Sequence, residues 1–143
     1  MSTVTTLQDP PVSVRAKLAA AWASFMFLYI YVDYFALYKP GFVDGIQAGL
    51  VWEFDVNQGL LTAFLALISI PTAMVVLSVA LPARATRTLN LVVAALYVPV
   101  TAFNAVGESW VAFYALSIGL ELLLLAYIAH AAWTWPRTTQ VDR

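Results

Sequence analysis

The sequence predicts an all-α membrane protein, folded as a four-helix transmembrane bundle with both termini in the cytoplasm. Hydrophobic residues make up 62% of the chain and charged residues only 10%, whereas a soluble domain carries about 25% charged residues. Four continuous apolar segments approach or exceed the roughly 20 residues that cross a bilayer. The chain of 143 residues has room for these spans and short connections, so we expect a single domain.

The four spans follow one another closely along the chain. They are predicted at 17–38, 60–81, 88–106 and 110–135, with cytoplasmic tails at 1–16 and 136–143. Continuous apolar runs exclude a β-barrel, whose strands alternate over about ten residues. Because no small-x-small cleavage site follows the first span, we expect an uncleaved anchor and not a signal peptide.

The basic residues predict how the spans are oriented, since lysine and arginine favour cytoplasmic flanks. Six of the seven fall on one side of the four spans: Arg15, Lys17, Arg84, Arg87, Arg137 and Arg143. The other side has only Lys39, together with four acidic residues. We therefore expect a multi-pass protein whose N and C termini are both cytoplasmic.

The longest connection, residues 39–59, is predicted on the outer side. Ile46, Leu50 and Phe54 recur at i, i+4 and i+8, which favours a short helix on the membrane surface. Other apolar residues interrupt this face, so an irregular cap over the bundle is the alternative. Asn57 precedes the second span and is expected to cap its first turn.

Two carboxyl groups lie within the spans, where charged residues are rare and costly. Asp33 is five residues before Tyr38, roughly 8 Å below the outer rim at 1.5 Å per residue. Glu121 is eleven residues after Trp110, roughly 16 Å deep by the same rise. That depth is about the midplane of a hydrocarbon core roughly 30 Å thick.

Polar neighbours extend both carboxyl groups into stripes. Tyr114, Ser117 and Glu121 share a face of the fourth span, and Tyr29 shares a face with Asp33 on the first. Counting depths places Tyr29 level with Glu121, and Asp33 level with Ser117 and Tyr114. If the first and fourth spans are neighbours, Tyr29 can donate to Glu121, and Ser117 or Tyr114 to Asp33.

These residues, with Asn104 near the same outer mouth, predict an outward-facing polar cleft that binds or transports a proton, a cation or a small ligand. The alternative is a non-catalytic accessory or structural subunit of a membrane complex, in which these groups only fix helix register. A third possibility is an aromatic-lined site for a lipid or quinone. Four helices leave little room for an enclosed path, so we expect a homo-oligomer or a larger membrane protein partner, besides the lipid bilayer.

Several classes of function are disfavoured. The net charge of −1 offers no basic surface for nucleic acid. With no cysteine and a single histidine, no metal site or cofactor is predicted within one chain. His130 lies nine residues from Glu121, about 180° around the helix, and at the membrane face opposite to Asp33. It is better explained as an interfacial residue than as a ligand, and an enzyme is the weakest class.

Proline interrupts the second and third spans. Pro71 and Pro99 each leave a carbonyl without its helical partner four residues earlier, at Leu67 and Ala95. Kinks at these positions would either widen a cavity or simply shape the packing of the helices.

The stretches YIYVDYFALYKPG (29–41), NQG (57–59), IPTAMVVLS (70–78), RATRTLN (84–90), LELLLLAYIA (120–129) and AWTWP (132–136) span nearly the whole chain. In this order they resemble a family of short, four-span bacterial membrane proteins with no assigned function. The resemblance implies a four-helix bundle in the bacterial inner membrane and a distant likeness to DoxX-like proteins. It implies no catalytic residue, although Asp33 and Glu121 belong to the recurring pattern.

Overall fold

The structure, a computed structural model, describes residues 9–137 of the chain. Its elements, in chain order, are α1 (Val14–Ala36), α2 (Phe42–Gln47), β1 (Leu50–Val51), β2 (Phe54–Asp55), α3 (Gln58–Ala80), α4 (Ala83–Phe103) and α5 (Val111–Trp133). Four of these helices, α1, α3, α4 and α5, are long and apolar enough to cross a membrane. This confirms the predicted fold class of a four-helix bundle of apolar helices.

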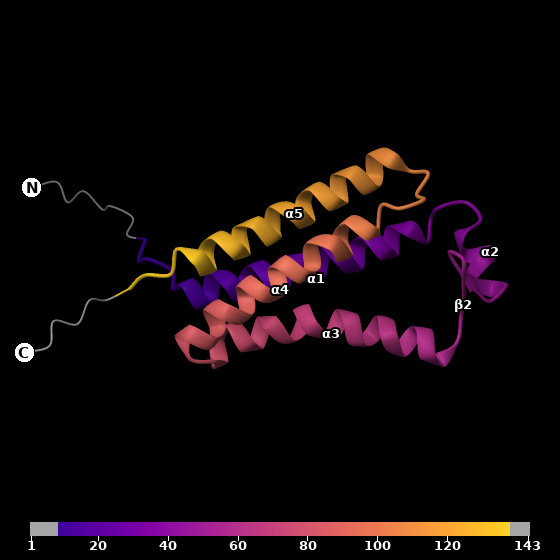
Figure 1. Ribbon diagram of the computed structural model, residues 1–143. Helices are drawn as coiled ribbons and strands as arrows, with labels where there is room; N and C mark the ends of the chain where they lie inside the picture. The colour runs from indigo at the N-terminus through magenta and orange to yellow at the C-terminus, as the bar shows by residue number, and fades with distance from the viewer. Residues whose placement is uncertain (1–8, 138–143) are drawn as a thin grey trace, which may run out of the picture.

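The four long helices pack side by side in alternating directions (Figure 1). Helix α1 packs against α3 and α5, and α4 packs against α5 and α3, so α1 and α4 face each other across the bundle. We call the end where α1 begins and α5 ends the terminal end. The opposite end, with residues 37–57 and 104–110, is the loop end. The packing of α1 against α5 meets the condition on which the two predicted polar stripes depend.

Side chains cap two of the long helices. At the start of α1, Ser13 Oγ accepts a hydrogen bond from the Ala16 N–H at 3.2 Å. At the start of α3, Asn57 Oδ1 accepts one from the Leu60 N–H at 2.9 Å, which confirms the predicted cap. Extended backbone at Leu81, just before a proline, separates α3 from α4.

Helix α4 reaches further toward the terminal end than the predicted span at 88–106. It begins at Ala83, and Arg87 in its second turn contacts α5. Arg87 Nε donates to the carbonyl of Ala132 at 3.2 Å, and its guanidinium lies over the Trp133 ring, 5.6 Å from the ring centroid. This basic side chain therefore joins two helices where the sequence predicted a loop.

Residues 39–59 combine a short helix with a hairpin, so neither predicted alternative describes the whole segment. Ile46 lies in α2, whereas Leu50 lies in β1 and Phe54 in β2. The helical spacing of these three residues stops at α2 because Gly49, with a φ of +84°, turns the chain out of the helix.

The apolar core fills the terminal half of the bundle. Its largest members are Leu18, Trp22 and Phe25 of α1, Met74 of α3, Tyr97 of α4, and Leu125 and Ile128 of α5. The Trp22 ring meets the Phe25 and Tyr97 rings edge to face, with centroids 5.7 and 6.3 Å apart. This layer separates the terminal end from the loop-end half of the bundle.

Asn90 forms a hydrogen-bond network within this core. Its Oδ1 accepts from Trp22 Nε1 at 2.7 Å, and its Nδ2 donates to the Thr86 carbonyl at 2.8 Å and to Ser78 Oγ at 3.3 Å. All four residues are buried. The network ties α1, α3 and α4 together, and the buried amide is fully used.

The loop-end half of α3 diverges from the other helices (Figure 1). Residues 61–67 are exposed on every side of the helix. The hydroxyls of Thr62, Ser69 and Thr72 donate to carbonyls four residues earlier in α3, at 2.7, 2.7 and 2.8 Å. These bonds satisfy the hydroxyls within the helix, which suits a segment that faces lipid.

Candidate functional site

Glu121 is buried in the middle of α5. The residue is 2% exposed, and its Oε2 has no hydrogen-bond partner within residues 9–137. The Thr101 side chain of α4 faces this carboxyl group, without hydrogen-bond geometry, and Thr101 Oγ1 is likewise buried and without a partner in that part of the chain. Two unpaired polar atoms therefore lie in the interior between α4 and α5.

Tyr29 of α1 lies close to this carboxyl group, at the level that the sequence predicts. Its hydroxyl is near enough to Glu121 and Asp33 to interact with both electrostatically. It accepts a hydrogen bond from Asn104 Nδ2 at 2.6 Å. The structure thus brings Tyr29 and Asn104 together across the bundle, but the predicted hydrogen bond from Tyr29 to Glu121 is not formed.

Asp33 lies nearer the loop end of α1 and is exposed. Its carboxyl group lies within electrostatic range of Glu121 and Tyr114, and within residues 9–137 it has no hydrogen bond or ion pair. Ser117 is buried, but its Oγ donates to the Tyr114 carbonyl of its own helix at 3.0 Å. The predicted bond from Ser117 to Asp33 is absent because the serine is satisfied locally.

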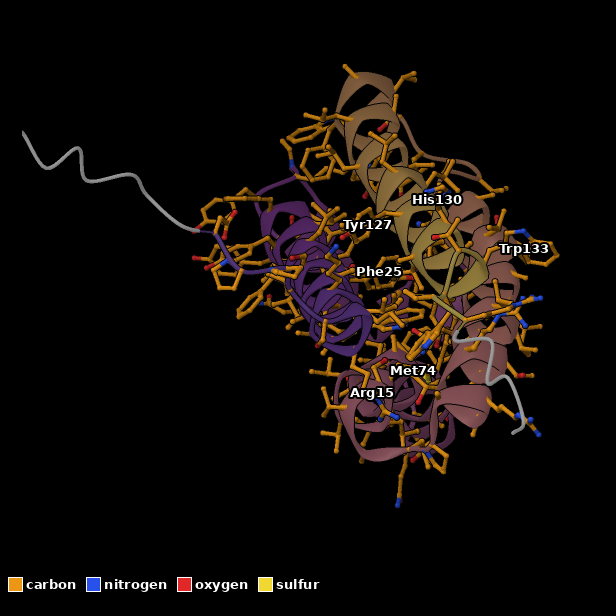
Figure 2. The ribbon with its side chains drawn as sticks, turned by 90° about the vertical axis from the view of Figure 1, so that its left-hand side faces the viewer. Arg15, Phe25, Met74, Tyr127, His130 and Trp133 are labelled. Atoms are coloured by element: carbon orange, nitrogen blue, oxygen red, sulfur yellow. The ribbon has the colours of Figure 1, made fainter. Side chains whose placement is uncertain are left out.

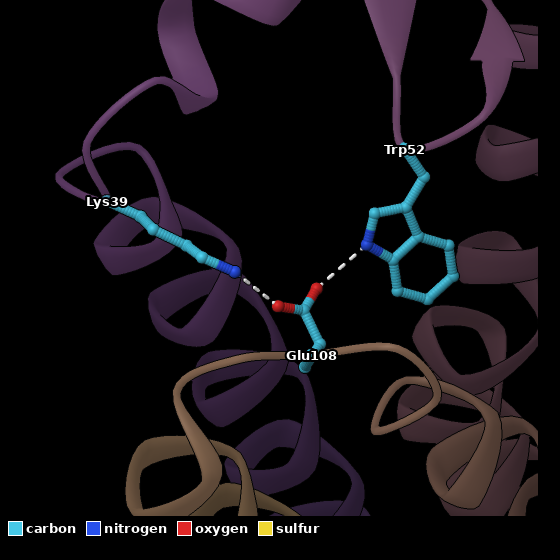
Figure 3. A network of polar contacts seen from close by, with 3 residues as sticks. All are labelled: Lys39, Trp52 and Glu108. Carbon is cyan, nitrogen blue, oxygen red and sulfur yellow. Dashed lines mark hydrogen bonds and ion pairs between the residues drawn. The ribbon is translucent and has the colours of Figure 1, made fainter.

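Glu108, in the loop between α4 and α5, joins three loop-end segments (Figure 3). It accepts hydrogen bonds from Lys39 Nζ at 2.6 Å and from Trp52 Nε1 at 2.8 Å. Lys39 Nζ also lies 5.8 Å from the centroid of the Tyr114 ring. Burial by itself raises the pKa of Glu108, but the two hydrogen bonds and the Lys39 charge outweigh it, so the pKa is lowered.

Thr101 is the site residue that sequence reasoning missed. The signal was a polar face on α4, since Asn90, Tyr97, Thr101 and Asn104 follow one another at intervals of seven, four and three residues. Of these four residues, only Asn104 was among the predicted site residues, because it lies near the outer mouth.

We call Tyr29, Asp33, Thr101, Asn104 and Glu121 the Glu121 cluster. It lies in the loop-end half, with the apolar core between it and the terminal end. Its groups offer carboxyl, hydroxyl and amide oxygens, which suit protons and hard cations more than transition metals. Across residues 9–137, no three His, Cys, Asp or Glu side chains gather in a group that could hold a metal ion.

A protein-family model described as a family of unknown function (DUF6326) matches residues 13–141. No curated protein and no solved structure matches the chain. Because the family match covers nearly all of the sequence, the chain belongs to the DUF6326 family, whose function is unknown.

Proposed function

We propose that this small membrane protein binds a proton or a small cation at the Glu121 cluster. The observation that carries the proposal is the Glu121 carboxyl group, which is 2% exposed and has an oxygen without a hydrogen-bond partner in the described chain. A structural carboxyl group in a bundle interior is expected to have its oxygens satisfied. An unsatisfied one is suited to a ligand that brings a donor or a positive charge.

Charge balance supports the same conclusion. Within residues 9–137, Lys39 and Glu108 form one salt bridge, and no basic side chain of that range pairs with Glu121. An isolated carboxylate near the centre of a bilayer costs several kcal/mol. A bound proton or a small cation removes that cost, and the facing Thr101 hydroxyl and the Tyr29 hydroxyl add oxygens around it.

The direction of access follows from the packing. The exposed Asp33 lies between Glu121 and the loop end and provides a first negative charge for an incoming cation. Toward the terminal end, the rings of Trp22, Phe25 and Tyr97 fill the interior. Because these rings fill the interior on the terminal side, we expect a ligand to reach the proposed site from the loop end, and transport across the bilayer would require this aromatic layer to open.

The membrane setting of the proposal comes from the sequence. The basic residues favour cytoplasmic termini, so the loop end and the cleft would face outward. The family resemblance implies that the membrane is a bacterial inner membrane. The distant likeness to DoxX-like proteins belongs to the same expectation. Since one bundle encloses little space, a transporting form would be a homo-oligomer or part of a larger membrane protein assembly.

The Asn90 and Glu108 networks favour a second candidate, an accessory or structural subunit without transport. In both networks, polar groups are paired and connect helices or loops. Purification from native membranes separates the two candidates. A stable stoichiometric complex with another membrane protein favours the accessory role, and a homo-oligomer favours ligand binding.

The binding proposal is tested by infrared difference spectroscopy of the protein in nanodiscs, as the pH is varied and as sodium or potassium is added. We expect a carboxyl band that responds to one of these changes and that is missing from Glu121→Gln. Glu53→Gln, which changes an exposed carboxyl group in the hairpin, should retain the band.

A band that persists unchanged in a folded Glu121→Gln protein would refute the assignment. If that variant does not fold, Asp33→Asn provides the second test, because this exposed residue is not needed for packing. Its substitution should weaken the response to added cations, and an unchanged response would count against the cleft.

A further inference from the structure

A groove of about 470 Å³ lies between α1 and α5 in the terminal half of the bundle. Ala20 and Ser24 of α1 and Leu124 and Tyr127 of α5 line it, with Lys17 also on its wall. Figure 2 looks onto the terminal end and shows Tyr127 between α1 and α5. The groove is separate from the Glu121 cluster and shares none of its residues.

The depth of the groove matches one leaflet of a bilayer. Lys17 is three residues inside α1, roughly 5 Å from its first residue, and Ser24 is ten residues inside, roughly 15 Å. The deepest part of the groove, at Ser24, therefore lies at about half the depth of a hydrocarbon core that is roughly 30 Å thick. A transmembrane helix of a second copy would continue past this point, whereas an acyl chain ends near it.

Charge also distinguishes the possible occupants. Within residues 9–137, the Lys17 ammonium group has no hydrogen bond or ion pair. Arg15 and Arg87, at the same end, donate to main-chain carbonyls at the ends of α3 and α5. Neither forms an ion pair with an acid in the described part of the chain. A second copy docked symmetrically on this groove would bring two Lys17 side chains together, which is unfavourable. An anionic headgroup at the mouth is favourable.

We propose that the groove binds one acyl chain of an anionic phospholipid. The phosphate lies at Lys17, near the end of the helix. About one turn deeper, the Tyr127 hydroxyl donates to the glycerol ester. The chain occupies the space left by Ala20 and Ser24, against Leu124. This site does not depend on ligand binding at the Glu121 cluster.

The test measures the binding of phosphatidylglycerol and phosphatidylcholine to the detergent-solubilised protein by native mass spectrometry. Phosphatidylglycerol should bind more tightly, and Lys17→Gln should weaken it about fivefold, the effect of one basic residue near a lipid surface. Arg84→Gln is the matched control, since Arg84 is an exposed basic residue at the same end that does not line the groove. It should retain the affinity.

A second pair of variants tests the chain-binding part. Ala20→Leu fills the groove and should reduce the binding of both lipids, whereas Ala126→Leu adds the same bulk at an exposed position on α5 and should not. Equal losses in Lys17→Gln and Arg84→Gln would overturn the proposal in favour of diffuse surface charge. A dimer that Ala20→Leu disrupts would overturn it in favour of a second copy. If Ala20→Leu does not fold, the exposed Lys17 still decides the matter.

Discussion

Tyr97 of α4 donates its hydroxyl hydrogen to the main-chain carbonyl of Leu67 in α3. This carbonyl has no partner in its own helix, because the residue four positions later is Pro71, which has no N–H. Pro71 is itself buried, at the level where α3 begins to diverge from the bundle. The phenol of Tyr97 thus replaces the helical bond that the proline removes, and it joins α3 to α4 at this level.

Tyr97→Phe should destabilise the bundle by about 1 kcal/mol, since it leaves the Leu67 carbonyl unpaired in a membrane interior. The phenylalanine ring keeps the contacts with Trp22 and Phe25. In a Pro71→Ala background the restored N–H can bond the Leu67 carbonyl, so Tyr97→Phe should destabilise the bundle less than it does in the wild type. Unfolding in mixed detergents, measured for the four proteins of this double-mutant cycle, gives the coupling.

Tyr31→Phe is the control for loss of a hydroxyl, because Tyr31 is exposed and makes no side-chain hydrogen bond within residues 9–137. An equal cost of Tyr97→Phe in both backgrounds would mean that the Leu67 carbonyl is not what the phenol stabilises.

Asn90→Leu should destabilise the protein by about 1–3 kcal/mol, because it leaves the buried Trp22 indole N–H without an acceptor. Ser78→Ala removes only the longer contacts of this network, at 3.3 and 3.4 Å, and should cost less than half as much. The same detergent unfolding assay compares the two. If the costs were similar, the indole bond would not be the main contribution of Asn90.

Acid should weaken the loop-end network through Glu108. Its lowered pKa means that the folded state favours the carboxylate, so the stabilisation is present above the ordinary glutamate pKa of about 4.3 and is lost as the pH falls through the lowered value. Glu108→Gln should be less stable than the wild type at neutral pH, and the difference should vanish in strong acid. Thermal unfolding of both proteins across this pH range measures the difference, and Glu53→Gln controls for an exposed carboxyl group.

The parts of the fold that depend on local sequence could be predicted. The four apolar runs, the cap at Asn57 and the shared face of Tyr29 and Asp33 follow from length, spacing and side-chain chemistry. The level of Tyr29 with Glu121 follows from the helical rise alone. These predictions needed no knowledge of which helices become neighbours, except for the packing of the first span against the last.

The remaining contacts depend on distant partners. Lys39 and Glu108 are 69 residues apart, and Trp22 and Asn90 are 68 apart. No local pattern relates such positions, so the sequence indicated only that these residues were polar or interfacial. Thr101 has a helical spacing to Asn104, but its position opposite Glu121 depends on the packing of α4 on α5.

Thr101→Val distinguishes a ligand site from a structural contact. Valine has nearly the shape of threonine without the hydroxyl, and the Thr101 hydroxyl is buried without a partner in the described chain. Removing an unpaired polar group from an interior is neutral or stabilising in the absence of a ligand. If the hydroxyl belongs to a ligand site at the Glu121 cluster, Thr101→Val should therefore unfold no more easily than the wild type. It should, however, respond more weakly to added cations in the infrared experiment. A loss of stability by about 1 kcal/mol or more, with an unchanged response, would assign Thr101 to the packing of α4 on α5 and remove it from the site.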